Sequence, residues 1–188
     1  MIYKSQEKAL RKQAAEILRQ THFPVTETEL DSIAVADFGL SNPLSEGAQI
    51  LTLFATDRIS AKLIVLLPNQ ILPEHWHPPV GDDPGKEEIL RGFWGTLRYF
   101  EEGPDTLDIS LIPPGKQDCF TCTKRRDLQS GDQVIIPPGV KHWMQGGVDG
   151  GCVISFSTCV RDILDQFTDP AIVRTTKIVD DEIQGGVL

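Results

Sequence analysis

Apolar side chains near the start of the chain recur at helical spacing. Between residues 5 and 20 they fall on one stripe of a helix, at Leu10, Ala14, Ile17 and Leu18. After the Phe23-Pro24 break, Thr26 and Glu29 stand three residues apart and form a capping box, which predicts a second short helix. We therefore assign residues 1–40 to an N-terminal helical segment.

From residue 50 onward the pattern changes to short β-prone runs bounded by Gly, Pro, Asn or Asp. These runs cover residues 50–55, 61–67, 87–100, 107–112, 120–123, 133–136 and 152–158. Many short strands without long helical crossovers predict an all-β fold. An antiparallel sheet of this size must hide its edges, which favours a barrel or jelly roll. We place this barrel at residues 41–175 and a short C-terminal tail at residues 176–188.

The composition is typical of one packed domain and excludes some partners. The chain has 188 residues, of which 40% are hydrophobic and 24% charged, so neither disorder nor a fibrous architecture fits. Its formal net charge of -9 repels a phosphate backbone, and we therefore expect no nucleic-acid partner.

The sequence does not favour a membrane protein or a disulfide-bonded protein. No apolar run approaches the ~18 residues of a membrane span, and the start MIYKSQEKALRKQ is too polar for a signal peptide. We expect a cytoplasmic protein without a membrane partner. The cysteines are interpreted as thiols, because no second ligand pair at zinc-finger spacing accompanies Cys119 and Cys122.

Three of the four histidines fall in two segments that are predicted strand ends, EHWH and KHW. Because side chains alternate along a strand, His75 and His77 share one face. If the turn-rich loop after His77 returns as a hairpin, Glu88 faces the histidine pair across the strands. His142 follows a second turn and would complete a set of three histidines and one carboxylate.

This ligand set suits a divalent transition metal. Neutral imidazoles and a single carboxylate leave the ion with net positive charge, and an octahedral ion keeps two positions open for substrate oxygens. We favour Mn²⁺, with Fe²⁺, Co²⁺ or Ni²⁺ as alternatives. Zn²⁺ is less suitable because four ligands close a tetrahedral site. Any one of these histidines alone would be an ordinary buried or surface residue; only their combined spacing indicates a metal.

The spacing resembles the two motifs of the cupin family. The first motif is matched by His75, His77, Glu88 and Gly95, with a longer loop before the glutamate. The second motif, G-x5-P-x-G-x2-H, is matched by Gly131, Pro137, Gly139 and His142. The asparagine that often closes it is Gly146 here. The resemblance implies a cupin-type antiparallel β-barrel.

A narrower resemblance covers nearly the whole strand region. The segments PEHWHPPVGDDPGKEE, IPPGVKHWMQGG and FTDP resemble the D-lyxose isomerase family of metal-dependent cupins. That family interconverts D-lyxose and D-xylulose, and often D-mannose and D-fructose, on Mn²⁺. The resemblance implies the metal ligands His75, His77, Glu88 and His142. It also implies a homodimer and a monosaccharide substrate.

The lysine that the family carries two residues before the metal-binding glutamate is Lys86 here. On an extended segment Lys86 faces the same interior as Glu88. We expect burial and a nearby metal to lower the pKa of Lys86, so that it serves as a proton acceptor. Alternatively, Lys86 lies in water or pairs with Asp82 or Asp83.

Aldose to ketose conversion moves a proton from C2 to C1, and Lys86 and Glu88 are the candidate catalytic residues. A glutamate held by a metal is a weak base, so a second acid or base is needed. Related isomerases carry a glutamate on the late strand, where this chain has Ser155. The family's second carboxylate is then missing.

We assign substrate binding to Lys86, Asp165 and Trp143. Asp165 would contact sugar hydroxyls if its segment covers the barrel, and is otherwise exposed to water. Trp143 would stack on the sugar ring, and otherwise packs in the core.

Two further functions fit the same motifs. One is a cupin dioxygenase that uses Fe or Ni, although an oxygenase has little need for Lys86. The other is a sugar-binding cupin without catalysis, which Ser155 makes more plausible.

Overall fold

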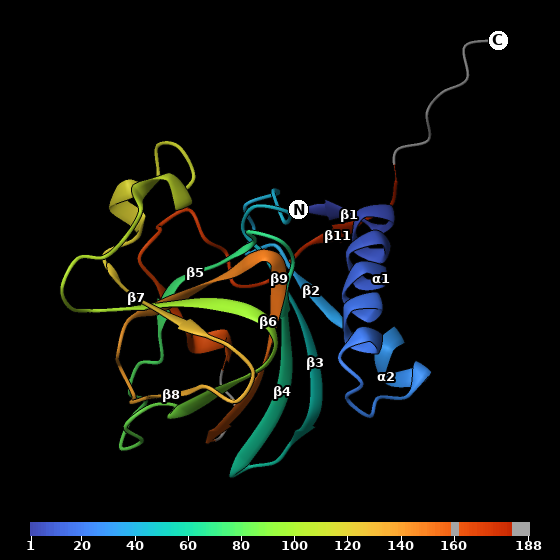
Figure 1. Cartoon of the computed structure of the whole chain (residues 1–188), viewed down its shortest axis with the longest axis horizontal. Coiled ribbons are helices and arrows are strands. Elements are labelled where there is room, and N and C mark those ends of the chain that lie inside the picture. The colour runs from blue at the N-terminus through green and yellow to red at the C-terminus, as the bar shows by residue number, and fades with distance from the viewer. Residues whose placement is uncertain (159–161, 182–188) are drawn as a thin grey trace.

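A curled antiparallel sheet dominates the computed structural model, which describes residues 1–158 and 162–181 (Figure 1). Its strands are β2 (Ala34–Ala36), β3 (Ala48–Ala55), β4 (Ile59–Leu66), β5 (Ile71–Trp76), β6 (Glu88–Glu101), β7 (Lys124–Leu128), β8 (Gln133–Ile136), β9 (His142–Thr158) and β10 (Gln166–Phe167). A separate parallel pair joins β1 (Ile2–Tyr3) to β11 (Ile178–Val179). The predicted all-β antiparallel fold is confirmed.

The long strand β9 holds the sheet together. Its first part lies between β5 and β6, and its second part lies between β4 and β6. Where β6 bends over β9, Gly95 has φ +61, and a Cβ there would lie 2.5 Å from the carbonyl oxygen of Gly150. Only glycine allows this close approach, so the bend that curls the sheet depends on it.

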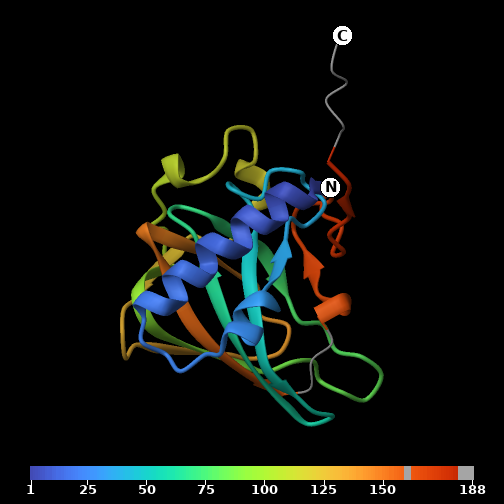
Figure 2. The same ribbon diagram turned by 90° about the vertical axis from the view of Figure 1, so that its right-hand side faces the viewer.

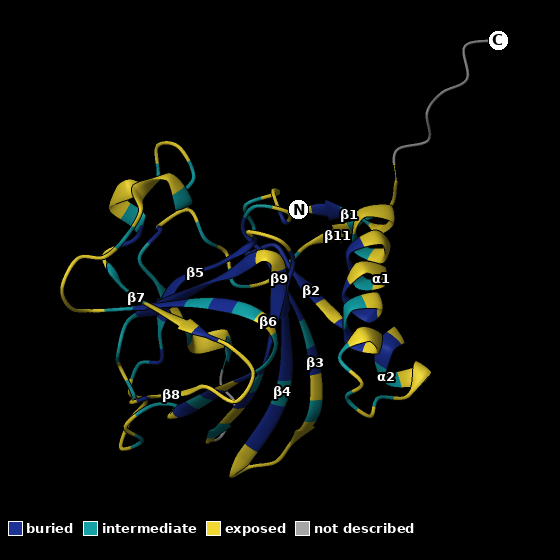
Figure 3. Ribbon diagram, in the orientation of Figure 1, coloured by how far each residue is buried: buried dark blue, intermediate teal, exposed yellow. Residues whose placement is uncertain are grey.

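The concave face of the sheet encloses the main core. Leu66, Leu90 and Met144 belong to its buried apolar cluster, and Figure 3 shows that β4, β5 and much of β9 are buried. Several polar side chains are buried on the same face, among them His142 and Ser155. This polar region within an apolar interior is where the candidate site lies.

The two predicted helices are confirmed as α1 (Lys4–Gln20) and α2 (Glu27–Asp31), and both cover the convex face of the sheet (Figure 2). Ala14 and Leu18 of α1 pack against the same cluster as Leu63 of β4. At the start of α2, Thr26 Oγ1 accepts a hydrogen bond from the Glu29 amide at 3.2 Å, as the capping box predicts. Among the described residues, neither of these helices nor any other combines the length and apolarity needed to cross a membrane.

Two of the predicted strands are wrong. The segment 107–112 contains the 3-10 helix η1 (Ile109–Leu111), and residues 120–123 follow η2 (Gln117–Cys119) without strand pairing. Their apolar side chains, Ile112 and Phe120, are buried in a cluster around Trp143. The apolar runs therefore reflect loops that pack on the sheet. In contrast, β7 has the charged sequence KRRDL, which gives no β pattern.

The borders of the predicted segments are crossed by strand pairing. Residues 34–36, which we assigned to the helical segment, form β2 and pair with β3. Residues 178–179 of the predicted tail pair with β1. The last residues of that tail, 182–188, lie outside the described part of the chain.

Candidate metal centre and adjoining pocket

Three histidines meet on the concave face of the sheet. The pairing of β5 with β9 shifts register between Leu72 and His75, and His75 then stands directly opposite His142. The His75 and His142 ring centroids are 4.3 Å apart, and the His77 ring lies 5.4 Å from His75 and 5.2 Å from His142. Residues three apart on a regular strand point to opposite faces, but Leu72 and His75 both line the inner pocket. The register shift between them therefore turns His75 toward the pocket, as a β-bulge does.

Glu74, which directly precedes His75, is buried and connects β5 to the neighbouring loops. Its carboxylate accepts hydrogen bonds from the Thr121 and Cys122 amides, both at 2.7 Å, and from the Thr168 hydroxyl at 2.6 Å. The turn that precedes His142 is fixed to the same strand, because the Gly139 amide donates to the carbonyl oxygen of His77 at 2.9 Å. These bonds hold the histidine-bearing segments in place.

The histidine nitrogens are arranged as in a metal site. Nδ1 of His75 lies 2.9 Å from the carbonyl oxygen of Pro73, and Nδ1 of His142 lies 3.0 Å from that of Val140. A carbonyl oxygen only accepts, so each Nδ1 carries the proton and each Nε2 presents a lone pair. Within residues 1–158 and 162–181, Nε2 of His142 and both ring nitrogens of His77 are buried without a hydrogen-bond partner.

The charge states of the histidines suit a cation. Burial lowers the pKa of all three imidazoles, and it lowers that of His77 to about 3, with Lys86 as the next cause. Neutral imidazoles are the form that binds metals. One possible ligand atom from each histidine lies within 4.8 Å of the others, so the group could hold a metal ion.

Glu88 joins this group from β6. Its side chain is buried, and its Oε2 lies 3.4 Å from His77 Nε2. The expected hairpin between His77 and Glu88 is wrong, because β5 and β6 both pair with β9, which lies between them. The curvature of the sheet, and not direct strand pairing, brings the carboxylate to the histidines.

Ser155 of β9 points into the same interior, and its hydroxyl donates to Glu88 Oε1. Burial raises the pKa of Glu88, but Lys86, the nearby histidines and Ser155 outweigh burial and lower it overall. Glu88 is therefore a carboxylate at neutral pH. Ser155 thus orients a carboxylate instead of supplying one.

Lys86 is buried beside Glu88, with its Nζ 3.6 Å from Glu88 Oε2 and 3.2 Å from Asp162 Oδ1. Burial lowers the pKa of Lys86, but Glu88, Asp162 and Asp165 outweigh burial and raise it above its ordinary value. The expectation of a lowered pKa is therefore wrong, because the sequence did not show these aspartates near it. The alternative that Lys86 lies in water is also wrong, because its ammonium group forms ion pairs with Glu88 and Asp162.

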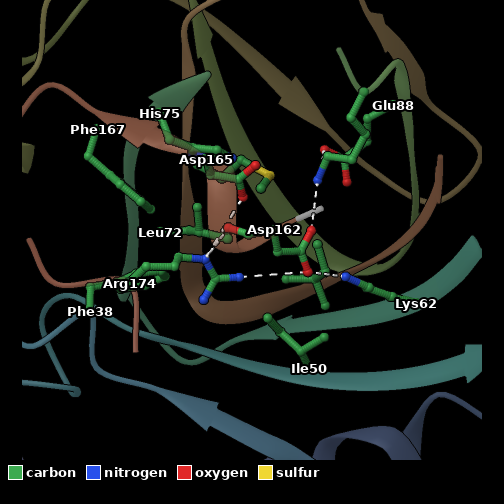
Figure 4. Close-up of a pocket in the computed structure, with 13 residues that line it drawn as sticks. Phe38, Ile50, Lys62, Leu72, His75, Glu88, Asp162, Asp165, Phe167 and Arg174 are labelled. Carbon is green, nitrogen blue, oxygen red and sulfur yellow. Dashed lines mark hydrogen bonds and ion pairs between the residues drawn. The ribbon is translucent and has the colours of Figure 1, made fainter. Parts of the chain in front are cut away.

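The segment after β9 supplies charged residues that the sequence analysis did not select. Asp162 accepts from Lys62 of β4 as well as from Lys86, and its carboxylate lies 3.7 Å from Arg174 Nη2. Figure 4 shows the Lys62 and Arg174 side chains pointing toward Asp162. Lys62 within an otherwise apolar strand was the one available signal, because a buried lysine requires a carboxylate partner.

Asp165 lies beside this ion network and faces the pocket (Figure 4). Burial is the main cause that raises the pKa of Asp165 to about 7; Lys86 opposes the rise and Asp162 adds to it. Asp165 thus lines the pocket, and its contact with a sugar stays a prediction.

The pocket has a polar side and an apolar side. The polar side carries His75, Lys86, Glu88 and the charged residues described above, and the apolar side includes Phe38, Ile50, Leu72 and Phe167. An apolar wall opposite fixed charges can bind the C–H face of a polyhydroxy compound and orient its hydroxyls.

Known proteins with similar sequences are sugar isomerases. No family model matches the chain. It is 43% identical over 173 residues to the D-lyxose ketol-isomerase of Cohnella laeviribosi, covering 92% of this chain and 95% of that protein. The chain belongs to the D-lyxose isomerase family. The D-lyxose/D-mannose isomerase of Thermosediminibacter oceani is 39% identical over 96% of this chain and all of its own length.

Solved structures show the same fold at lower identity. The L-ribose isomerase of Cellulomonas parahominis superimposes with a TM-score of 0.76 at 17% identity, over 95% of this chain and 98% of its own. This similarity confirms the predicted cupin-type fold. It extends over the N-terminal helices as well as the sheet.

The structure corrects the assignment of Trp143 to the substrate. Its side chain is fully buried, stacked on Phe100 at a centroid distance of 3.6 Å, and its Nε1 donates to the carbonyl oxygen of Cys122 at 2.8 Å. Trp143 points away from the pocket because it alternates with His142 along β9. It anchors the loop that contains Cys122.

We expect Trp143→Phe to lower the free energy of unfolding by about 1–3 kcal/mol, because the substitution leaves the buried Cys122 carbonyl without its donor and removes packing. Urea denaturation of the chelator-treated protein measures this loss. With the metal restored, KM for the sugar should stay at the wild-type value. A raised KM with unchanged stability would return Trp143 to the sugar site.

Proposed function

We propose that the protein is a metal-dependent aldose–ketose isomerase that interconverts D-lyxose and D-xylulose, and also D-mannose and D-fructose. The observation that carries this proposal is the convergence of His75, His77, His142, Glu88 and Lys86 in one pocket. Membership of the D-lyxose isomerase family supports the substrate class.

The four predicted ligands fit a divalent ion. Among the described residues, the buried Nε2 of His142 and the nitrogens of His77 have no hydrogen-bond partner, and such atoms are costly to bury unless a ligand satisfies them. We propose Mn²⁺, held by His75, His77, Glu88 and His142. When bound, such an ion would supply Lewis acidity that stabilises negative charge developing on the sugar oxygens.

The other residues of the pocket would bind the sugar and move protons. Lys86 is a cation at neutral pH, so we propose that its ammonium group donates a proton to the sugar carbonyl oxygen and later recovers one from the neighbouring hydroxyl. Glu88 stays a ligand, because Ser155 and Lys86 already engage its carboxylate. The apolar wall excludes water from the reacting carbons.

Purified protein supplied with Mn²⁺ should convert D-lyxose to D-xylulose, and chelation should abolish the conversion until metal is restored. Product analysis by chromatography with each of the four sugars measures this. No product from D-lyxose or D-mannose with Mn²⁺, Co²⁺, Fe²⁺ or Ni²⁺ would reject the proposal. Oxygen consumption would instead identify a dioxygenase, and saturable sugar binding without turnover would identify a binding protein.

Two substitutions should separate metal binding from catalysis. His142→Ala removes a ligand and should lower the metal content of the purified protein. Lys86→Ala should leave the metal content unchanged and reduce kcat about 10²- to 10⁴-fold, the typical contribution of a positioned acid or base. Metal analysis and kinetics measure both effects.

The exposed Lys8 provides a matched control, because Lys8→Ala removes a lysine far from the pocket and should change neither quantity. Lys86→Gln tests the same point with less disturbance of packing if the alanine variant is unstable. Equal metal loss in the Lys86 and His142 variants would contradict the separate roles.

We also propose that the protein is cytoplasmic and forms a homodimer, as the family resemblance implies. Light scattering during gel filtration should then give a molar mass of twice the chain mass of 20.8 kDa. A mass of one chain at micromolar concentration would contradict the dimer.

A further inference from the structure

The pocket contains three carboxylates, and two of them are already engaged. Glu88 contacts His77 and Lys86 and accepts a hydrogen bond from Ser155. Asp162 accepts from Lys62 and Lys86. A carboxylate held by several cations and hydrogen bonds is a poor proton acceptor, because each contact stabilises its charged form.

Asp165 differs from both. Among the described residues its carboxylate accepts no hydrogen bond, and its ion pair with Arg174 is long, with Oδ2 3.9 Å from Nε. Its side chain is nevertheless only 9% exposed. A buried carboxylate that lacks close protein partners and lines a pocket is available to a ligand.

Strand pairing places Asp165 beside the metal-binding strand. In the antiparallel pair of β10 and β5, Phe167 lies opposite His75 and Gln166 opposite Trp76. Asp165 precedes Gln166 and His77 follows Trp76, and both side chains line one small cavity. The Phe167 and His75 rings are 5.7 Å apart, and alternation puts Asp165 on the same face as Phe167.

Lys86 also stands near this carboxylate. Asp165 and Lys86 line the same pocket together with His75 and Glu88, and both also line a smaller neighbouring cavity with His77. The pocket therefore presents an ammonium group and an available carboxylate together. Isomerisation requires a group for the oxygen protons and a second group for the carbon proton.

We propose that Asp165 carries the carbon-bound proton between C2 and C1 of the sugar, a role that rests on the proposed isomerase function. The Asp165 carboxylate accepts the C2 proton as the C2–H electron pair forms the C1–C2 double bond. The carbonyl oxygen on C1 takes a proton from Lys86, which gives an enediol. Lys86 then recovers the proton of the C2 hydroxyl as C2 becomes the carbonyl, and Asp165 returns its proton to C1.

This role explains how the chain can do without a carboxylate at Ser155. The second carboxylate comes from the segment after β9, one residue before β10, instead of from β9 itself. Asp165 then acts on the substrate as a catalytic residue, beyond the hydrogen bonding to sugar hydroxyls that the sequence suggested.

Kinetics of Asp165→Asn with D-lyxose and Mn²⁺ test the proposal. The amide keeps the size and hydrogen bonding of the side chain but cannot accept the carbon proton, so kcat should fall by about 10²-fold or more while KM changes by less than about fivefold. Metal content should equal that of the wild type. D-lyxose deuterated at C2 should show a larger isotope effect on kcat in the variant, because proton removal from C2 has become slower.

Two further variants make the result specific. Asp165→Glu restores a carboxylate and should recover part of kcat. Asp149→Asn makes the same chemical change at an exposed turn of β9 and should retain wild-type kinetics. If Asp165→Asn is unstable in thermal melts, Asp165→Glu alone decides: it must retain more than a tenth of kcat and show an altered isotope effect.

The outcomes separate this inference from the proposed function. A wild-type protein that converts no sugar would reject the isomerase itself. A wild-type protein that converts D-lyxose, together with an Asp165→Asn variant that keeps kcat and only raises KM, would overturn the proton-transfer role and leave sugar binding. Unchanged kinetics in that variant would overturn it as well.

Discussion

Burial of neutral imidazoles without protein partners is the constraint on which the rest of this structure depends. His142 and His77 keep ring nitrogens inside the sheet to which no group in the described part of the chain hydrogen-bonds, and burying such atoms is costly. The surrounding structure must therefore hold these rings rigidly. The bonds of Glu74, and that of the Gly139 amide, do so by fixing the backbone on either side of the histidines. Such a site is favourable only when a ligand completes it.

The charges around the histidines show how the same fold keeps a lysine inside an apolar cavity. Lys62 and Lys86 would both be unfavourable there alone, and Asp162 compensates both from a segment that is distant in sequence. Arg174 lies next to the same carboxylate from further along the chain. The segment after β9 is thus part of the pocket wall, and its aspartates act with Glu88 to keep Lys86 an ammonium group. As an ammonium group, Lys86 can donate a proton, whereas a neutral amine at this position would accept one.

The sequence relatives and the structural neighbours support different conclusions about this protein. Relatives about 40% identical over nearly the whole chain establish the family, and the L-ribose isomerase structure, at 17% identity, establishes the fold. Identity at this level does not preserve every side chain in a pocket. Ser155 and Asp165 are therefore best understood from the contacts that each makes in this protein.

The sequence by itself determined the helices, the antiparallel β fold and the clustering of His75, His77, Glu88 and His142, because periodicity, capping and ligand spacing are local patterns. The apolar runs at 107–112 and 120–123 were wrongly predicted as strands, because a buried loop can have the same run of apolar residues as a buried strand. Only the tertiary structure decided that Trp143 packs away from the pocket, that Glu88 and Asp162 together keep Lys86 charged, and that Asp165 lines the pocket. These features depend on which side chains meet across the strands and on the electrostatic interactions between them. The spacing of residues along the chain does not determine either one.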